Sequence, residues 1–249
     1  YMEAHMIRFL LVCITVIGFL ILSIPILIVE WIIGKFNPTK GYQLSASDPV
    51  SFPFYPVADG VEVTVIGEEL VPTDEAVLYI GNHRSFFDIL LTYTRCPRLT
   101  GYIAKAEMEK IPLLSNWMII STVSSLTGKY KKGLKTILSG IELIKSGISV
   151  CIFPEGTRNR NKSDLELLEF HEGSFRLSTK TDCLIVPIAM NNTVSIFEKQ
   201  FPKIRKNHVV LEYCKPFRPS ELSKEDQKHI GEYTRTLILE TLKKNEPLV

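Results

Sequence analysis

The sequence predicts an α/β fold with a mainly parallel central sheet flanked by helices, preceded by an N-terminal hydrophobic membrane helix or helical hairpin. Short apolar runs with strand character alternate with segments of helical periodicity, which is typical of such a sheet. The mean hydropathy is +0.12, and its apolar excess is concentrated in the N-terminal segment. We therefore divide the chain into a membrane anchor (1–36), a linker (37–56) and one main domain (57–249).

The N-terminal segment carries no charged residue between positions 9 and 29. As a helix this stretch is roughly 32 Å long, close to the thickness of the bilayer core. A cleaved signal peptide and a buried soluble helix are the alternatives, but the run is too long for the first and too hydrophobic for the second. Trp31 near its end suits an interfacial anchor, whereas Pro25 leaves open whether the segment spans the membrane or folds within one leaflet.

The linker is rich in proline, serine, glycine and aspartate. Beyond it, short β-rich or apolar runs predict strands at residues 61–66, 76–80, 102–104, 148–153, 184–189 and 209–213. Residues 86–93 have helical spacing of apolar side chains. Residues 131–145 form a second predicted helix, with lysines on one side and Leu134, Ile137, Leu138, Ile141 and Ile144 on the other. A last helix begins at Ser223, with Asp226 as its capping partner and apolar positions that include Ile230, Leu237, Ile238 and Leu242.

Several functional classes lack support. The net charge of +2 gives no reason to expect a nucleic-acid partner, and the five cysteines form no C-x-x-C pair. No G-x-S-x-G, G-x-G-x-x-G, Walker-type or H-E-x-x-H motif is present in the sequence. A nucleophile-elbow hydrolase, a nucleotide-binding loop and a metal site are therefore unsupported.

One candidate catalytic pair follows the strand predicted at 76–80. His83 lies at the end of that strand and Asp88 about one turn into the next helix, so a short loop can turn the carboxylate back towards the imidazole. Histidine suits removal of a hydroxyl proton, and a carboxylate on its other nitrogen fixes the tautomer. The plain alternative is a loop histidine beside two helix-capping residues, Asn82 and Asp88.

The second candidate motif, F-P-E-G-T-R at residues 153–158, follows the strand predicted at 148–153. Arg158 can bind a phosphate group bidentately, and Gly156 permits close approach of the backbone to a ligand. The alternative is a strand-ending turn with a surface arginine.

Together, in this order, the motifs resemble those of the bacterial 1-acylglycerol-3-phosphate acyltransferases (the PlsC type), a family marked by N-H-x-x-x-x-D and F-P-E-G-T-R. Further likeness lies at residues 105–112, 170–176 and 186–188, and the resemblance covers about residues 61–217. It implies that an acyltransferase domain, 57–249, moves a fatty acyl group from acyl-ACP or acyl-CoA to lysophosphatidic acid, giving phosphatidic acid. It also implies attachment to the cytoplasmic membrane with the domain on the cytosolic side, and no metal or cofactor.

The resemblance assigns roles to individual residues. His83 becomes the general base and Asp88 its orienting partner. The acceptor would be bound by Glu155, Gly156, Thr157 and Arg158, with Arg158 at its phosphate, and substrate contacts are also expected from Lys105 and Lys129.

The sequence departs from the family in one segment. The family usually carries a second phosphate-binding arginine before the central helix, whereas residues 125–132 contain only lysines as basic residues. Lys129, Lys131 and Lys132 either supply the charge or form the solvated start of a helix, so a different lysolipid acceptor stays open. Residues 111–120 are either core or a second membrane contact. A non-catalytic, membrane-tethered lipid-binding homologue is the remaining alternative.

Overall fold

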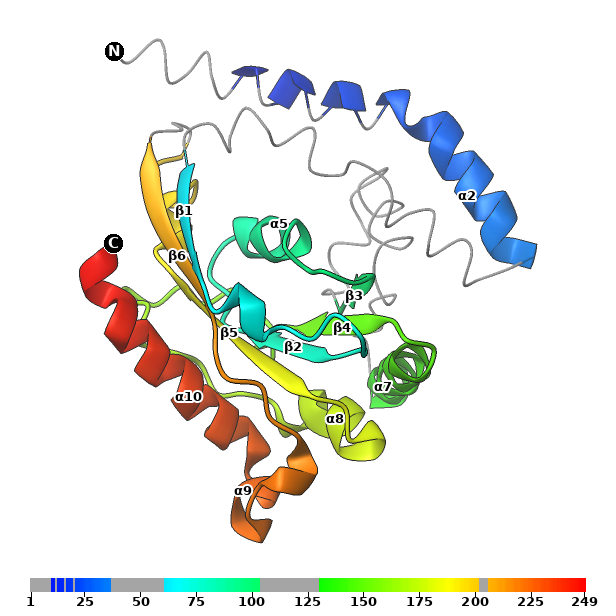
Figure 1. Cartoon of the computed structure of the whole chain (residues 1–249). Coiled ribbons are helices and arrows are strands. Elements are labelled where there is room, and N and C mark those ends of the chain that lie inside the picture. The colour runs from blue at the N-terminus through cyan, green and yellow to red at the C-terminus, as the bar shows by residue number, and fades with distance from the viewer. Residues whose placement is uncertain are drawn as a thin grey trace.

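A computed structural model describes residues 10–36 apart from 12, 16 and 20, and residues 61–103, 130–201 and 206–249. Its centre is one six-stranded sheet with the strand order β1-β6-β5-β2-β4-β3 (Figure 1). The strands are β1 (Val61–Ile66), β2 (Leu78–Gly81), β3 (Thr100–Tyr102), β4 (Ser149–Ile152), β5 (Ile185–Asn191) and β6 (Asn207–Tyr213).

Four of the five strand pairs are parallel, and only β5 and β6 pair antiparallel. Strands β1 and β6 therefore run opposite to the other four. Adjacent antiparallel strands need no crossover helix, which fits the placement of β6 directly beside β5. The predicted α/β class with a mainly parallel sheet is confirmed.

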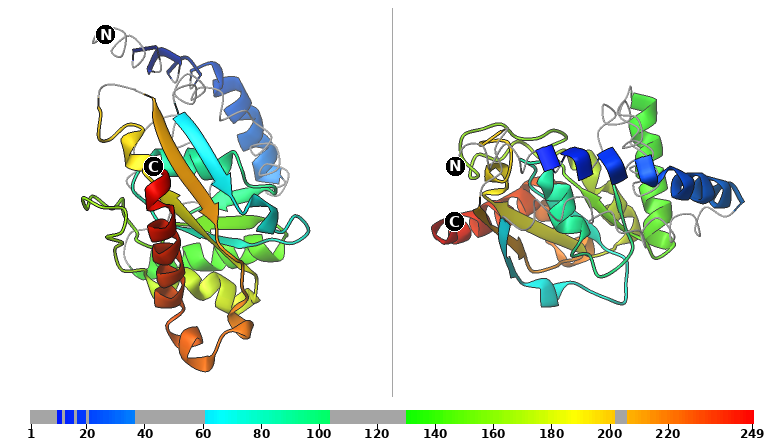
Figure 2. Two further views of the ribbon diagram at one scale, coloured as in Figure 1. Left: turned by 60° about the vertical axis from the view of Figure 1, so that its left-hand side comes forward. Right: turned by 90° about the horizontal axis from the view of Figure 1, so that it is seen from above.

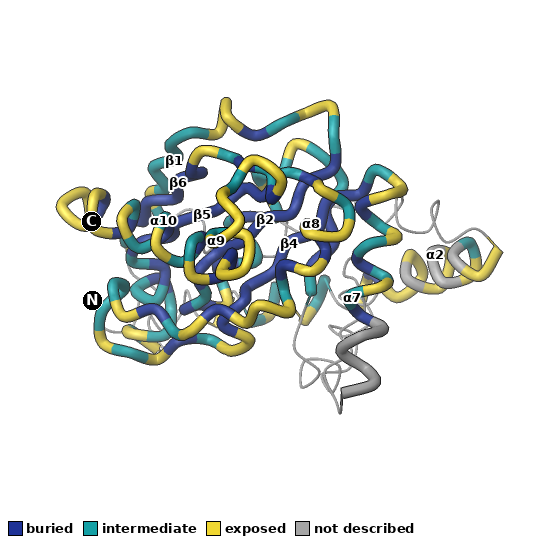
Figure 3. Tube along the Cα trace, turned by 90° about the horizontal axis from the view of Figure 1, so that it is seen from below, coloured by how far each residue is buried: buried dark blue, intermediate teal, exposed yellow. Residues whose placement is uncertain are grey.

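Helices cover both faces of this sheet (Figures 1 and 2). One core cluster joins Leu78 and Ile80 of β2 to α7 (Tyr130–Lys145), α8 (Arg176–Thr181) and α10 (Ile230–Asn245). A second cluster joins Val77 and Tyr79 to α5 (Phe87–Tyr93), because successive strand residues point to opposite faces. The central strands β2, β4 and β5 are buried throughout (Figure 3).

The structure corrects two boundaries. Strand β3 pairs through Thr100–Tyr102 with β4, so the predicted strand at 102–104 begins too late. Gly101 lies at the centre of this pairing, and because glycine has no side chain, the apolar pattern of the sequence does not mark the strand there. The last helix is two helices, because His229, at φ −118° and ψ 40°, separates α9 (Lys224–Lys228) from α10. The predicted cap is present, since the Ser223 hydroxyl accepts a hydrogen bond from the Asp226 N–H at 3.1 Å.

The central helix α7 confirms the prediction for residues 131–145 but not every apolar position. Ile137, Ile141 and Ile144 pack against the core cluster. Leu138 is 52% exposed and therefore does not belong to the core-facing side. The side chain of Leu134 lies outside the described residues.

The N-terminal part is helical in its described residues up to Leu22, turns at Ser23 and continues as α2 (Ile24–Phe36). Pro25 lies in the first turn of α2, where proline is tolerated, and α2 extends outside the sheet-and-helix body (Figures 1 and 2). Most of its described apolar side chains are exposed, with Phe36 at 86%. Among the described residues, no helix combines the length and the apolar character that crossing a bilayer requires. The membrane helix or hairpin stays a prediction.

Residues 37–56 and 111–120 lie outside the described part of the chain, so the predicted linker and the second membrane contact remain predictions. The boundaries of the three predicted parts are likewise untested. All five cysteines are described and none forms a disulfide; Cys151, Cys183 and Cys214 are buried.

Candidate active site

The two sequence motifs meet because their strands are neighbours. Strands β2 and β4 pair in parallel, so their carboxyl ends lie at the same edge of the sheet. His83 follows β2 by two residues, and the 155–158 turn follows β4. Ligand sites in α/β folds are formed at such an edge.

The predicted contact between His83 and Asp88 is present. The His83 Nδ1 atom lies 2.8 Å from the Asp88 Oδ2 atom. The same carboxylate oxygen accepts hydrogen bonds from the backbone N–H groups of Arg84 at 2.7 Å and Ser85 at 2.8 Å. A carboxylate can only accept, so in the neutral imidazole the proton lies on Nδ1 and the lone pair on Nε2. The side chain of Asp88 is fully buried, and that of His83 is 15% exposed.

Further contacts fix the histidine and its loop. The His83 ring stacks on Phe153, with centroids 4.4 Å apart and planes inclined by 17°. The side-chain amide of Asn82 exchanges two hydrogen bonds with the backbone of Met190 in β5, each 2.9 Å long. Asn82 therefore extends the sheet and does not cap α5, so the capping alternative for this residue is wrong.

Glu155 supports the backbone of the His83 loop. Its Oε1 atom accepts the backbone N–H of His83 at 2.8 Å, and its Oε2 atom accepts that of Leu168 at 3.0 Å. The residue is 3% exposed, and burial raises the pKa of its carboxyl group despite these hydrogen bonds. Glu155 thus fixes the backbone of the loop that carries His83, and its contact with the acceptor stays a prediction.

The rest of the turn lies at the surface. Gly156 has φ +68°, and a Cβ atom there would lie 3.1 Å from the His171 ring, so only glycine fits without strain. Thr157 is exposed. The guanidinium carbon of Arg158 lies 3.5 Å from the centroid of the Phe86 ring, and its Nη1 atom is 3.4 Å from Glu198 Oε1. Arg158 is therefore held beside the start of α5, where the His83–Asp88 loop ends.

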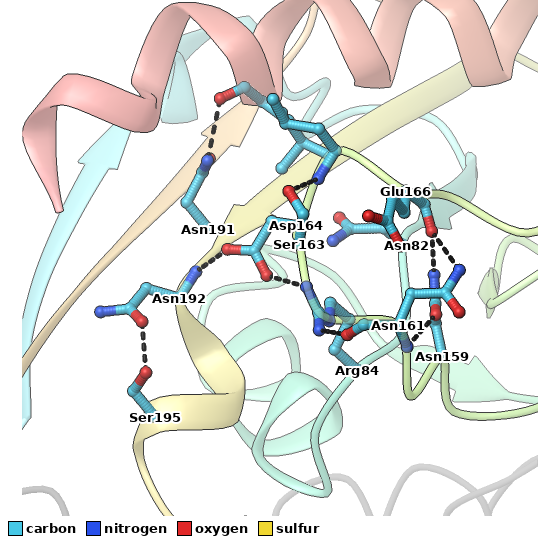
Figure 4. Close-up of polar contacts among 12 residues, drawn as sticks. Asn82, Arg84, Asn159, Asn161, Ser163, Asp164, Glu166, Asn191, Asn192 and Ser195 are labelled. Atoms are coloured by element: carbon cyan, nitrogen blue, oxygen red, sulfur yellow. Dashed lines mark hydrogen bonds and ion pairs between the residues drawn. The ribbon is translucent and has the colours of Figure 1, made fainter. Parts of the chain in front are cut away.

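A polar network around the buried Arg84 side chain ties the loop after β2 to the chain after the turn (Figure 4). The Arg84 guanidinium, whose side chain is 3% exposed, donates to the Asp164 carboxylate and to the Asn161 carbonyl. The other oxygen of Asp164 accepts the backbone N–H of Asn192 at 2.7 Å. The Asn159 N–H donates to the His83 carbonyl at 2.7 Å. The loops after β2, β4 and β5 are thereby joined.

Removal of Asp164 should destabilise the fold. The Asp164→Ala variant leaves the buried Arg84 charge uncompensated, which costs about 3 kcal/mol and lowers Tm by roughly 10 °C. Thermal unfolding of the purified protein followed by circular dichroism measures the change. The exposed residue Asp74 provides the control, and Asp74→Ala should leave Tm unchanged. Equal Tm values for the two variants would show that the network does not stabilise the fold.

Other predicted residues cannot be placed. Lys105, Lys129 and the side chains of Lys131 and Lys132 lie outside the described residues. In the described part of the chain, no three histidine, cysteine, aspartate or glutamate side chains gather as a metal site, and the absence of a metal stays a prediction for the whole chain.

The sequence did not identify Arg84, Asn159 or Glu198 as parts of the site. Arg84 lies inside the first motif and Asn159 directly follows the second, so proximity alone was a usable signal. Glu198 is far from both motifs in sequence, and no local pattern marks it.

Comparison with known proteins shows that the chain is similar to acyltransferases. A family model described as acyltransferase matches residues 62–191. The chain is 27% identical over 195 residues to a 1-acyl-sn-glycerol-3-phosphate acyltransferase of Cocos nucifera, covering 76% of this chain and 61% of that protein. It is 31% identical over 143 residues to the protein of the same name from Borreliella burgdorferi, covering 56% of this chain and 55% of that protein.

A solved structure is also similar. The 1-acyl-sn-glycerophosphate (LPA) acyltransferase PlsC of Thermotoga maritima aligns with a TM-score of 0.73 at 20% identity, over 97% of each chain. At this identity the likeness establishes the fold. The chain spans less than two thirds of the length of both curated relatives, at 61% and 55%.

Proposed function

Because the chain belongs to the acyltransferase family, with residues 62–191 matching the family model, we propose that it transfers a fatty acyl group from a thioester to the free hydroxyl of lysophosphatidic acid, giving phosphatidic acid. The observation that carries the proposal is the His83–Asp88 pair at 2.8 Å, with a Nε2 atom that no described residue hydrogen-bonds, on a partly exposed ring. The names of the curated relatives support lysophosphatidic acid as the acceptor.

The proposed reaction uses His83 as a general base. The acceptor hydroxyl attacks the thioester carbonyl carbon while the His83 Nε2 atom takes its proton, and a tetrahedral intermediate forms. Collapse of the intermediate breaks the carbon–sulfur bond, and the leaving thiolate takes the proton from the imidazolium. The buried Asp88 carboxylate, 2.8 Å from Nδ1, stabilises the imidazolium between these steps. No enzyme nucleophile is required.

Arg158 is proposed to bind the acceptor phosphate. Its guanidinium lies against Phe86, at the start of the helix that carries Asp88, and is partly exposed. Among the described residues, its hydrogen bonding is limited to the long contact with Glu198, so further N–H donors are available for a phosphate.

The role of Arg158 predicts a specific kinetic defect. Arg158→Ala should lower kcat/KM for lysophosphatidic acid roughly 30-fold, mainly through KM, because a charge-assisted hydrogen bond of about 2 kcal/mol is lost. Arg158→Lys should fall between, because lysine lacks the planar fork. Steady-state kinetics with varied acceptor measures the effect. Arg160→Ala, two residues away and exposed, is the control. An unchanged KM in Arg158→Ala would remove Arg158 from the phosphate site.

The donor and the location are part of the same proposal. We propose acyl-ACP or acyl-CoA as the co-substrate, with no cofactor or metal. The exposed apolar side chains around α2 support attachment of the enzyme to a membrane. We propose the cytoplasmic membrane, with the catalytic domain on the cytosolic side, as the family resemblance implies.

The proposal is tested with purified protein, both donors and a panel of lysolipids. Formation of phosphatidic acid from lysophosphatidic acid, dependent on donor, is the expected result. Preference for another lysolipid would favour the alternative acceptor. That alternative is suggested by residues 125–132, whose basic residues are all lysines. Absence of transfer to every acceptor favours a non-catalytic lipid-binding homologue.

A further inference from the structure

We propose that Glu198 is a positioning residue that holds Arg158 in place for the acceptor phosphate and fixes the loop between His83 and Asp88. This inference rests on the proposed function and goes beyond it, because Glu198 belongs to neither motif. The residue lies after β5 and therefore follows both motif loops in the sequence. It contacts both of them.

The contacts with the catalytic loop are close. The Glu198 Oε2 atom accepts the Ser85 hydroxyl at 2.9 Å, and the Oε1 atom accepts the backbone N–H of Phe86 at 2.9 Å. Ser85 is fully buried, and its hydroxyl in turn accepts the N–H of Phe87 at 3.0 Å. Since the Ser85 N–H also donates to Asp88, Glu198 supports the same backbone that orients the catalytic carboxylate.

The contact with Arg158 has a different character. The Arg158 Nη1 atom lies 3.4 Å from Glu198 Oε1, while the guanidinium stacks on the Phe86 ring at 3.5 Å. The aromatic ring and the carboxylate thus hold Arg158 from two directions, although neither takes up its full set of donors. The side chains of Arg158 and Glu198 are 28% and 20% exposed, so the pair is open to an incoming anion and only partly screened by solvent.

This arrangement lowers the entropy that Arg158 loses when a phosphate binds. A free arginine side chain samples many rotamers, and fixing it at the moment of binding weakens affinity. With Glu198 in place, the guanidinium is oriented before the acceptor arrives. The benefit applies to acceptors that carry a phosphate group, and it is absent for acceptors that do not.

Two substitutions at position 198 separate the contact with Arg158 from the two contacts with the loop between His83 and Asp88. Glutamine keeps an oxygen for the Phe86 N–H and places an amide where the Ser85 hydroxyl can accept, but it removes the charge that attracts Arg158. Glu198→Gln should therefore raise KM for lysophosphatidic acid about fivefold and leave kcat within about twofold. Glu198→Ala loses all three contacts and should lower kcat as well.

The experiment measures kcat and KM for lysophosphatidic acid and for a phosphate-free monoacylglycerol, in full-length protein. The expected result is a rise in KM for Glu198→Gln with the phosphorylated acceptor alone, and no further rise when Glu198→Gln is added to Arg158→Ala. Glu232→Gln, which removes the carboxylate beside Arg235 at 3.2 Å on the surface of α10, is the matched control.

Other outcomes overturn the inference in distinguishable ways. A wild-type enzyme that acylates lysophosphatidic acid, together with an unchanged KM in Glu198→Gln, refutes the role of Glu198 alone. An equal rise in KM for both acceptors, or additive effects of Glu198→Gln and Arg158→Ala, also refutes it. A wild-type protein inactive on every phosphate-bearing acceptor refutes both this inference and the proposed function.

Discussion

Replacement of His83 by alanine is expected to lower kcat about 10³-fold, within the range of 10² to 10⁴ that general-base catalysis supplies. Without the Nε2 lone pair, the acceptor hydroxyl attacks while still protonated. The acceptor KM should change little, because His83 acts on the reacting hydroxyl and Arg158 on the phosphate. Acyl transfer with a radiolabelled donor, at saturating acceptor, measures the loss.

The control for this variant is His229→Ala, which removes an imidazole that is 67% exposed at the break before α10. It should retain full activity. Circular dichroism should show that both variants are folded, because His83→Ala removes one ring from a stack on Phe153 and leaves the backbone hydrogen bonds to Glu155 and Asn159 available. Undiminished kcat in folded His83→Ala would end the assignment of His83 as the base.

The Asp88→Asn variant should have the second largest effect, a loss of about 10² in kcat. The Oδ2 position accepts three N–H groups, so the amide of asparagine must place its oxygen there and its NH2 group at the other position. The tautomer of His83 is then kept and only the negative charge is lost. The loss in kcat should therefore be smaller than the roughly 10⁴-fold loss expected when the histidine takes the other tautomer.

A stability change should accompany this loss. Asparagine replaces a charged acceptor by a neutral one, which weakens the three hydrogen bonds that the Oδ2 atom accepts in the buried site. This costs about 1–3 kcal/mol of unfolding free energy. Kinetics and urea unfolding measure the two effects, with Asp74→Asn at an exposed position as the control. A loss in kcat as large as that of His83→Ala, without any change in stability, contradicts this account of Asp88.

The sheet and the paired motifs were predictable because their signals are local. Buried strands such as β2, β4 and β5 are apolar on both faces, and the helix over 131–145 repeats its apolar residues at helical intervals. His83 and Asp88 lie five positions apart, so one short loop determines their contact. The direction of β6 and the position of β3 were not predictable in this way, since strand pairing depends on backbone groups of distant segments.

The supporting residues of the site were harder to predict for the same reason. Glu155 stands within a motif that suggests ligand binding, yet its carboxylate binds two backbone N–H groups from His83 and Leu168. Only the folded chain brings those groups to it. The partners of Glu198 and Asp164 are distant in the sequence, with Ser85 113 positions from Glu198 and Asn192 28 positions from Asp164. A single sequence carries no periodicity that links them.

The backbone attachment of His83 has a consequence for engineering. Glu155 and Asn159 bind its N–H and carbonyl groups, and Asn82 binds β5, so the imidazole that we propose as the base is fixed to the sheet. A new acceptor or acyl chain must then be accommodated by segments around this scaffold, while the reacting group stays where it is. Chimeras that exchange peripheral segments between relatives are thus a route to altered lipid selectivity with the chemistry preserved.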